Sequence, residues 1–410
     1  MHTTTQEAPT TNVSYPALPS GQPRVGSVDI FRGFDLLLMI FVNSLAEATG
    51  LPWWTYHRGN VNGMTYVDMV FPAFLFLMGM SIPLAIDARR SRGQGHLQIW
   101  AHVVIRCASL LVMGLFIANA FHVNAQYTHL NQTWWASLGF LAIAVVWLRF
   151  PGEAKRPILR EVLRYSGLAL MAALFLIFRR VTPEGQPARL DFSYVEILGL
   201  LGWAYLLVSS IYLLIGKRFK LLLAAFAALV ALNAFSTLGW LHSVNDFLGP
   251  WYPFESGLCS LTMAGVLASL VIVGNQVASS FQKKFRWMFG SAAVLFTLGF
   301  LLQPLGISKN RDTPTWCLYC TAANFLIALL LYWIIDVKNQ RAWANFAKPV
   351  GENPLLAYLL AYVPFLVPPL YPLTPMGTSG WFGVVKSALL VLLMLVLTRL
   401  LVRARITLRV

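Results

Sequence analysis

Residues 27–86 read SVDIFRGFDLLLMIFVNSLAEATGLPWWTYHRGNVNGMTYVDMVFPAFLFLMGMSIPLAI. This stretch holds two apolar segments, each long enough to cross a bilayer, on either side of a loop that contains His57. Because an ionisable group at membrane depth is costly unless it faces protein or a wet cavity, the polar residues of these segments indicate a functional site. These residues are Asp29, Arg32, Asp35, Asn43, Glu47 and Asp68.

The composition of the whole chain predicts an integral membrane protein. Hydrophobic residues make up 57% of the chain and charged residues 11%, whereas soluble proteins contain about 25% charged residues. We expect an all-α bundle of about 12 (10 to 12) transmembrane helices, since roughly 20 apolar residues cross the hydrocarbon core. The predicted spans are 30–48, 65–86, 98–121, 133–149, 165–181, 194–216, 219–240, 256–279, 286–303, 314–336, 353–372 and 381–402.

The distribution of lysine and arginine predicts the orientation of these spans. One set of loops is strongly basic, with Arg89, Arg90 and Arg92 in the first of them, and the opposite set carries few basic residues. Because cytoplasmic loops are enriched in lysine and arginine, we expect both termini in the cytoplasm and the His57 loop outside. The net charge of +15 then reflects this asymmetry and attraction to anionic lipids, and we expect no nucleic-acid partner.

Few other features of the chain carry a chemical signal. Residues 1–23 contain no apolar signal-peptide core, so we expect a disordered cytoplasmic tail before a single membrane domain over 24–410. Cys317 and Cys320 form a Cys-x-x-Cys pair within an apolar span, where packing is the simpler interpretation than redox activity. The sequence contains no His-Glu-x-x-His, Walker or Gly-x-Ser-x-Gly motif, and we expect no metal.

Several segments resemble one family of membrane enzymes. RVGSVDIFRGF (24–34), FVN (41–43) and HRGNVNGMTYVDMVFPAFLFLMG (57–79) are similar to signatures of the heparan-α-glucosaminide N-acetyltransferase family and its bacterial relatives. The same order continues in FESGLCSL (254–261), GISKNRDTPTW (306–316), YWIIDV (332–337) and GENPLLAY (351–358). The resemblance implies a multi-pass acetyltransferase of the bacterial cytoplasmic (inner) membrane that uses acetyl-coenzyme A, with catalytic roles for His57 and Asn43.

The chain also departs from the family pattern. His57 stands five residues before Asn62, where family members have four, and Val61 replaces a tryptophan. An additional pair of spans, about 165–216, interrupts the family order. The mammalian member acts on heparan sulfate in lysosomes, and we expect this chain to use another acceptor.

Acetyl transfer from a thioester needs a base or nucleophile and hydrogen-bond donors for the developing oxyanion. His57 suits the first role because histidine titrates near neutral pH, and Asn43 suits the second. His57 could instead be an interfacial loop residue, and Asn43 could cap a helix or bond a neighbouring span. Asp68 is expected either to orient His57 or to pair with Arg32 or Arg106.

The two substrates are expected at opposite ends of the bundle. Arg32, Arg106 and Arg24 are the candidates for binding the phosphates of acetyl-coenzyme A, because arginine makes bidentate contacts with phosphate. Arg32 could instead pair with Asp29 or Asp35 and anchor its helix. The candidate contacts of the acceptor are Asn62, Lys309, Asn310 and Glu255.

The sequence thus predicts transfer of an acetyl group from cytoplasmic acetyl-coenzyme A to an amino or hydroxyl group of a sugar or glycan on the outer face. Transfer through an acetyl-histidine and direct transfer both stay open, as does a homodimer; membrane lipids are the other expected partners. A secondary transporter or exporter is the alternative, and it predicts internal two-fold repetition. Polar residues concentrate in the first two spans instead, which favours an enzyme.

Overall fold

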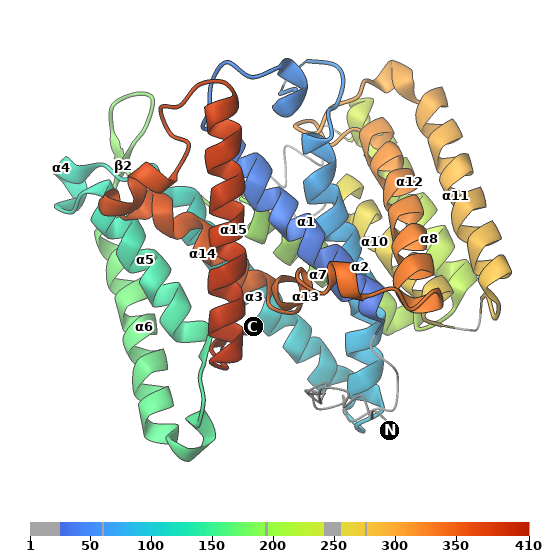
Figure 1. The fold of residues 1–410 in the computed structure, drawn as a ribbon, viewed down its shortest axis with the longest axis horizontal. Helices are drawn as coiled ribbons and strands as arrows, with labels where there is room; N and C mark the ends of the chain where they lie inside the picture. Colours follow the sequence, from blue (N-terminus) through green and yellow to red (C-terminus); the bar gives the residue numbers. More distant parts are fainter. Residues whose placement is uncertain (1–24, 60, 193–195, 242–255, 275–276, 410) are drawn as a thin grey trace, which may run out of the picture.

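The computed structural model describes residues 25–59, 61–192, 196–241, 256–274 and 277–409. Regular structure within these residues is almost entirely helical, which confirms the all-α class (Figure 1). Two antiparallel pairs of two-residue strands are the exceptions in this part of the chain: β1 (Leu148–Arg149) with β4 (Thr407–Leu408), and β2 (Arg180–Val181) with β3 (Pro187–Ala188). The expected tail over 1–23 lies outside the described residues.

Each of the twelve predicted spans contains a helix. In chain order these helices are α1 (Gly26–Leu45), α2 (Val67–Arg90), α3 (His96–Asn119), α5 (Gln132–Trp147), α6 (Pro157–Ile177), α7 (Ile197–Ile215), α8 (Phe219–Thr237), α10 (Ser256–Ile272), α11 (Phe281–Leu301), α12 (Pro314–Leu331), α14 (Pro354–Leu366) and α15 (Trp381–Arg403). Two short helices join them, α4 (Ala125–Thr128) and α13 (Lys348–Glu352), and a π-helical segment (Tyr332–Val337) extends α12. The predicted additional pair of spans corresponds to α6 and α7.

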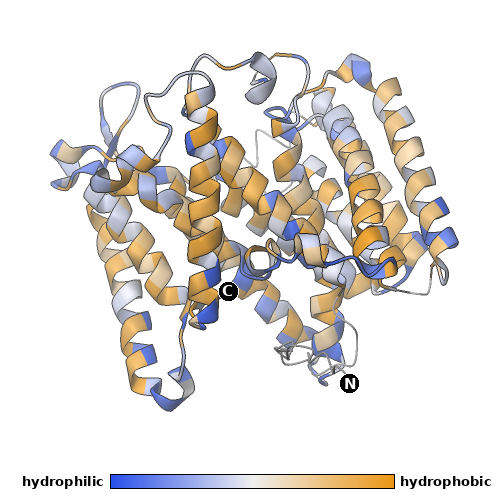
Figure 2. Ribbon diagram, viewed as in Figure 1, coloured by the Kyte–Doolittle hydropathy of each residue, from blue (hydrophilic) through white to orange (hydrophobic). Residues whose placement is uncertain are grey.

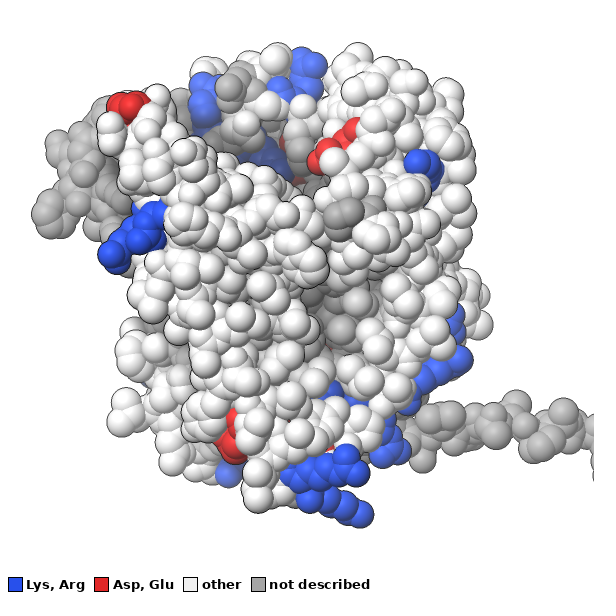
Figure 3. Space-filling model, turned by 90° about the vertical axis from the view of Figure 1, so that its left-hand side faces the viewer, with Lys and Arg blue, Asp and Glu red and all other residues white. Residues whose placement is uncertain are grey.

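Six helices of the described chain are long and apolar enough to cross a membrane, namely α2, α3, α7, α8, α12 with its extension, and α15. Three shorter ones, α5, α10 and α14, are also apolar. Figure 2 shows apolar residues along most helices and hydrophilic residues at helix ends and in loops. On the face drawn in Figure 3, Lys and Arg lie toward the two ends and the centre carries other residues. These features agree with a polytopic membrane protein. Twelve crossings and cytoplasmic termini stay predictions.

The centre of the bundle is the contact between α2 and α10, and glycine permits its closeness. A β-carbon at Gly79 of α2 would lie 1.9 Å from the carbonyl oxygen of Thr262, and one at Gly265 would lie 1.9 Å from that of Phe76. Every residue of α10 is buried. Small residues let helix backbones approach in this way, and the contact fixes α2 in the interior.

The beginning of α1 is held by a carboxylate from the extension of α12. Asp336 accepts hydrogen bonds from the backbone N–H groups of Gly26 and Ser27, at 3.1 Å each. These are two of the N–H groups that have no partner within the first turn of a helix. Asp336 therefore satisfies a helix end.

The loop between α1 and α2 lies at the upper end of the bundle in Figure 1. It begins with a 3₁₀ turn (Trp53–Thr55) and pairs with the loop that follows α11. The backbone N–H of Gly63 donates to the carbonyl of Ile307 at 2.9 Å, and the N–H of Ile307 donates to Asn62 Oδ1 at 2.7 Å. These bonds bring the His57 and Lys309 loops together.

Candidate active site

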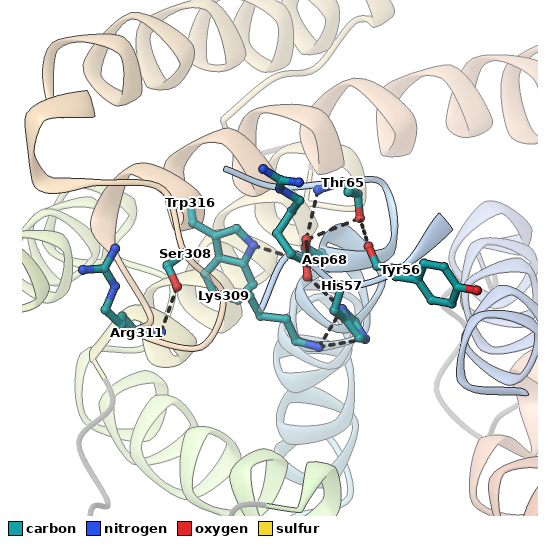
Figure 4. Close-up of polar contacts among 9 residues, drawn as sticks. Tyr56, His57, Thr65, Asp68, Ser308, Lys309, Arg311 and Trp316 are labelled. Carbon is teal, nitrogen blue, oxygen red and sulfur yellow. Dashed lines mark hydrogen bonds and ion pairs between the residues drawn. The ribbon is translucent and has the colours of Figure 1, made fainter. Parts of the chain in front are cut away.

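The structure brings His57 and Asp68 into direct contact. Nδ1 of His57 lies 2.7 Å from Oδ1 of Asp68 (Figure 4). The Asp68 side chain is 3% exposed and that of His57 is 34% exposed. Because a carboxylate only accepts hydrogen bonds, this contact places the imidazole proton on Nδ1 and makes Nε2 the basic nitrogen of the ring.

Asp68 is fixed by its position in the first turn of α2. Its Oδ2 accepts from the backbone N–H of Thr65 at 2.9 Å and from that of Arg58 at 3.4 Å. The indole N–H of Trp316 donates to the backbone carbonyl of Asp68 at 3.1 Å. The hydroxyl of Thr65 donates to the carbonyl of Tyr56 at 2.9 Å, so the peptide before His57 is also held. The carboxylate therefore has little freedom to turn away from the imidazole.

Lys309 completes the polar cluster. Its Nζ lies 3.4 Å from Nε2 and 3.5 Å from Nδ1 of His57, and Figure 4 shows the lysine reaching the ring from the loop before α12. Burial lowers the pKa of Lys309 below its usual value, and the negative charge of Asp68 offsets part of that effect.

The cluster has the arrangement that general-base or nucleophilic catalysis needs. A carboxylate orients a histidine, the free nitrogen of that histidine is accessible, and a hydrogen-bond donor stands beside it. Of the two roles considered for Asp68, the geometry agrees with orienting His57: its side-chain bonds go to the His57 loop and to Thr65, not to Arg32 or Arg106.

The predicted asparagines fall in different places. Asn43 lies in the last turn of α1 with an exposed side chain, and it makes no hydrogen bond with the described residues. Asn62 joins the two loops through its bond from Ile307. Asn310 is exposed beside Lys309. The structure thus groups His57, Asp68 and Lys309 by contact, with Asn62 in the same pair of loops.

A separate cavity of about 400 Å³ lies between α1, α2, α3, α7 and α14. Arg32 and Arg106 both line it, together with Tyr205, Asn353 and the apolar side chains of α2 and α7. The guanidinium of Arg106 stacks on the Tyr205 ring at 4.9 Å. The structure therefore places the two predicted phosphate-binding arginines at one cavity. Arg24 and Glu255 lie outside the described residues.

Arg32 also has the anchoring contacts that its alternative interpretation predicts. It donates to Asp29 at 3.3 Å, to the carbonyl of Gly351 at 3.0 Å and to the hydroxyl of Ser81 at 2.6 Å. Asp35 takes no part: its Oδ2 is buried without a hydrogen-bond partner in the described part of the chain. Arg32 is thus both a helix anchor and a cavity residue.

One buried polar network was not predicted. The hydroxyl of Tyr358, which lines the cavity, donates to Glu196 and lies 2.9 Å from the hydroxyl of Tyr362. Tyr358 ends the GENPLLAY segment, and that match was the available signal; Glu196, at the start of α7, had none. The four cysteines are buried and form no disulfide within the described residues. No group of three potential metal ligands occurs among the described residues.

Comparisons with known proteins indicate the family of the chain. The profile of a family described as "Domain of unknown function (DUF5009)" matches residues 24–255, more than half of the chain. Heparan-alpha-glucosaminide N-acetyltransferase of Homo sapiens is 39% identical over 103 residues, which cover 25% of this chain and 14% of that protein. The protein of the same name from Mus musculus is 38% identical over 100 residues, 24% of this chain and 15% of that protein. The resemblance expected from the sequence is confirmed over this part. The match spans about a seventh of the length of these relatives.

Proposed function

We propose that this chain, which belongs to the family described as a domain of unknown function (DUF5009), is a membrane-embedded acetyltransferase. It would move the acetyl group of acetyl-coenzyme A to an amino or hydroxyl group of a sugar or glycan. The names of the partial relatives support the reaction class. The single observation that carries the proposal is the contact of His57 with the buried Asp68.

In this proposal the imidazole of His57 performs the proton transfers. Nε2 takes the proton of the acceptor as the acceptor's nitrogen or oxygen attacks the acetyl carbon. As the carbon–sulfur bond breaks, the thiolate receives that proton from the imidazolium, whose charge Asp68 stabilises. Alternatively, Nε2 attacks the acetyl carbon first and holds the group until the acceptor arrives. The same contacts serve both routes.

The oxyanion that develops on the acetyl group would need hydrogen-bond donors near the imidazole of His57. Lys309 Nζ stands 3.4 Å from Nε2 and is the donor already at the ring. The side-chain amide of Asn43, near the end of α1, makes no hydrogen bond with the residues that the structure describes, and we propose it as the second donor. Asn62, Asn310 and Glu255 stay proposed contacts of the acceptor.

The cavity of Arg32 and Arg106 would hold the diphosphate of acetyl-coenzyme A, and Arg24 stays a proposed further contact. Coenzyme A supplies the activated thioester, and the two guanidinium groups supply charge-assisted donors for phosphate. Phe74 and Met39 line the same cavity. Phe74 lies six residues along α2 from Asp68, a rise of about 9 Å. An extended thioester arm could therefore lead from the cavity toward His57.

We further propose that the donor enters from the cytoplasm and that the acceptor waits at the outer face. The basic loops support this orientation. It also separates the substrates, since the cavity and the His57 loop lie at different levels of α2.

A substitution of His57 tests the proposal. In purified His57→Ala protein we expect no acetyl transfer to amino sugars or cell-envelope glycans, read by product mass, and unchanged binding of acetyl-coenzyme A. His102→Ala is the matched control, because His102 is an exposed histidine on α3. Full transfer by the His57 variant would remove this residue from the site. An exporter would release no thiol from acetyl-coenzyme A in either protein.

A further inference from the structure

A second hollow lies beside the candidate active site. It has a volume of about 750 Å³ and lies between the start of α2 and helices α11 and α12. Apolar side chains form most of its wall, including Met69, Phe289, Phe296 and Leu326. Phe289 is 53% exposed and Phe296 is 59% exposed, so the hollow opens to the outside of the bundle. We call it the α11–α12 groove.

One end of this groove is built from the segment that holds the candidate catalytic pair. Met64, Thr65 and Tyr66 line the groove. Thr65 also donates its backbone N–H to Asp68 and its hydroxyl to the carbonyl of Tyr56. Thr65 therefore belongs both to the wall of the groove and to the hydrogen bonds that hold Asp68.

Three basic residues lie in the paired loops that adjoin this end. Arg311 Nη2 lies 3.2 Å from the position that a β-carbon at Gly306 would take, and Arg58 Nε lies 3.6 Å from the corresponding position at Gly63. Lys309 stands at the ring of His57. The guanidinium of Arg58 stacks on Trp53, and neither arginine forms an ion pair with the residues that the structure describes. Asp68, already bonded to His57, is the carboxylate whose charge acts on Lys309.

An apolar groove beside a group of basic side chains fits one kind of molecule. A hydrocarbon chain would occupy the groove, and an anionic group attached to it would lie beside Arg58 and Arg311. Ordinary lipid also contacts apolar surface, but it gives no reason for a cation cluster beside a reactive histidine. Arginine forks are suited to phosphate oxygens.

Building on the acetyltransferase function proposed above, we propose that the acceptor is a lipid-linked sugar phosphate. Its chain lies in the α11–α12 groove, its phosphate lies at Arg58 and Arg311, and its amino or hydroxyl group reaches Nε2 of His57. The reaction is the one proposed above: the acceptor gains the acetyl group, and coenzyme A leaves as the free thiol with the proton of the acceptor.

Three acceptors with the same amino sugar test the assignment in lipid nanodiscs: the free sugar, its alkyl glycoside, and the sugar joined to an alkyl phosphate. We expect kcat/KM for acetyl transfer to rise at least about tenfold at each step of this series. Ala293→Phe places a ring into the groove from an exposed position of α11, and we expect it to reduce the preference for alkyl acceptors about tenfold. Val294→Phe is the control, since Val294 is exposed on the same helix outside the groove.

The charge is tested separately from the chain. Arg311→Gln should lower kcat/KM for the phosphate-bearing acceptor about tenfold relative to the alkyl glycoside. Equal kcat/KM for all three acceptors, with thiol release from acetyl-coenzyme A intact, would overturn the lipid-linked acceptor alone. Absence of thiol release and of any transfer would overturn the acetyltransferase function and this assignment with it. A groove that holds only bulk phospholipid would show no effect of Ala293→Phe on the preference.

Discussion

Replacing Asp68 with asparagine should disable the candidate active site while leaving the protein folded. Asp68 is the acceptor of the 2.7 Å contact with His57 and of the 2.9 Å bond from Thr65. Asparagine has the same shape but offers one oxygen, so its amide nitrogen must face one of these two donors. Either the imidazole loses its partner or the backbone of Thr65 does.

The expected loss of rate follows from the lost charge-assisted bond. Hydrogen bonds to charged groups contribute about 1.5–3 kcal/mol, which corresponds to a decrease in kcat of about 10- to 150-fold. The effect should fall on kcat rather than on the KM for acetyl-coenzyme A, because Asp68 does not line the cavity of Arg32 and Arg106.

The assay is thiol release and acetyl transfer by purified protein, together with the thermal midpoint in detergent. Asp87→Asn is a matched control: Asp87 lies on the same helix, accepts from the Tyr212 hydroxyl and pairs with Lys217 at 2.9 Å, far along the chain from His57. We expect its variant to lose stability without losing specific activity. Transfer by Asp68→Asn within about twofold of the parent would refute an orienting role for this carboxylate.

Three further changes test other parts of the structure. Arg106→Ala should raise the KM for acetyl-coenzyme A about 10- to 100-fold with kcat nearly unchanged, since it removes charge-assisted donors from the cavity; equal donor affinity in steady-state kinetics would make this arginine structural. Gly79→Ala puts a methyl group 1.9 Å from the carbonyl oxygen of Thr262. It should lower the free energy of unfolding by about 1–3 kcal/mol. Gly290→Ala is the control: its methyl group meets nothing within 4 Å, and the midpoint of thermal unfolding should stay unchanged. Burial lowers the pKa of Lys309, so the unfolded chain binds this proton more tightly than the folded protein does. The free energy of unfolding should therefore rise with pH from the folded pKa up to about 10.4. In Lys309→Met that rise should be smaller in thermal scans across this interval, and an identical pH dependence would argue against the buried cation.

The helices could be predicted because hydropathy reports directly on segment length. All twelve predicted spans contain helices, with ends shifted by a few residues where a polar end extends a helix, as in Arg89 and Arg90 at the end of α2. Six of them meet the length and composition of a membrane span. α1 carries Asp29, Arg32 and Asp35, and hydropathy cannot say how such charges are satisfied. That depends on Ser81 and Gly351, which are distant in sequence.

The candidate site was predictable only where its residues are close in sequence. His57 and Asp68 are eleven residues apart and flank one loop, so local sequence brings them close. Lys309 reaches the ring across a separation of 252 residues, and only the family resemblance pointed to its loop. Its contact depends on the pairing of residues 62–63 with Ile307. Glu196 and Tyr358 form a hydrogen bond although 162 residues separate them in sequence, and no local pattern predicts the pair.

Arg32 and Arg106, the two cavity arginines predicted to bind phosphate, are not equivalent, although the sequence presents them alike. Arg32 donates hydrogen bonds to Asp29, Gly351 and Ser81. These bonds hold α1 against α13 and α2. Arg106 stacks on Tyr205 and makes no hydrogen bond within the described chain, so its donors stay available to a ligand. A phosphate in this cavity would therefore bind Arg106 as a new partner and meet Arg32 already oriented by its neighbours. For this reason we expect Arg32→Ala to lower stability as well as donor affinity, and Arg106→Ala to lower donor affinity alone.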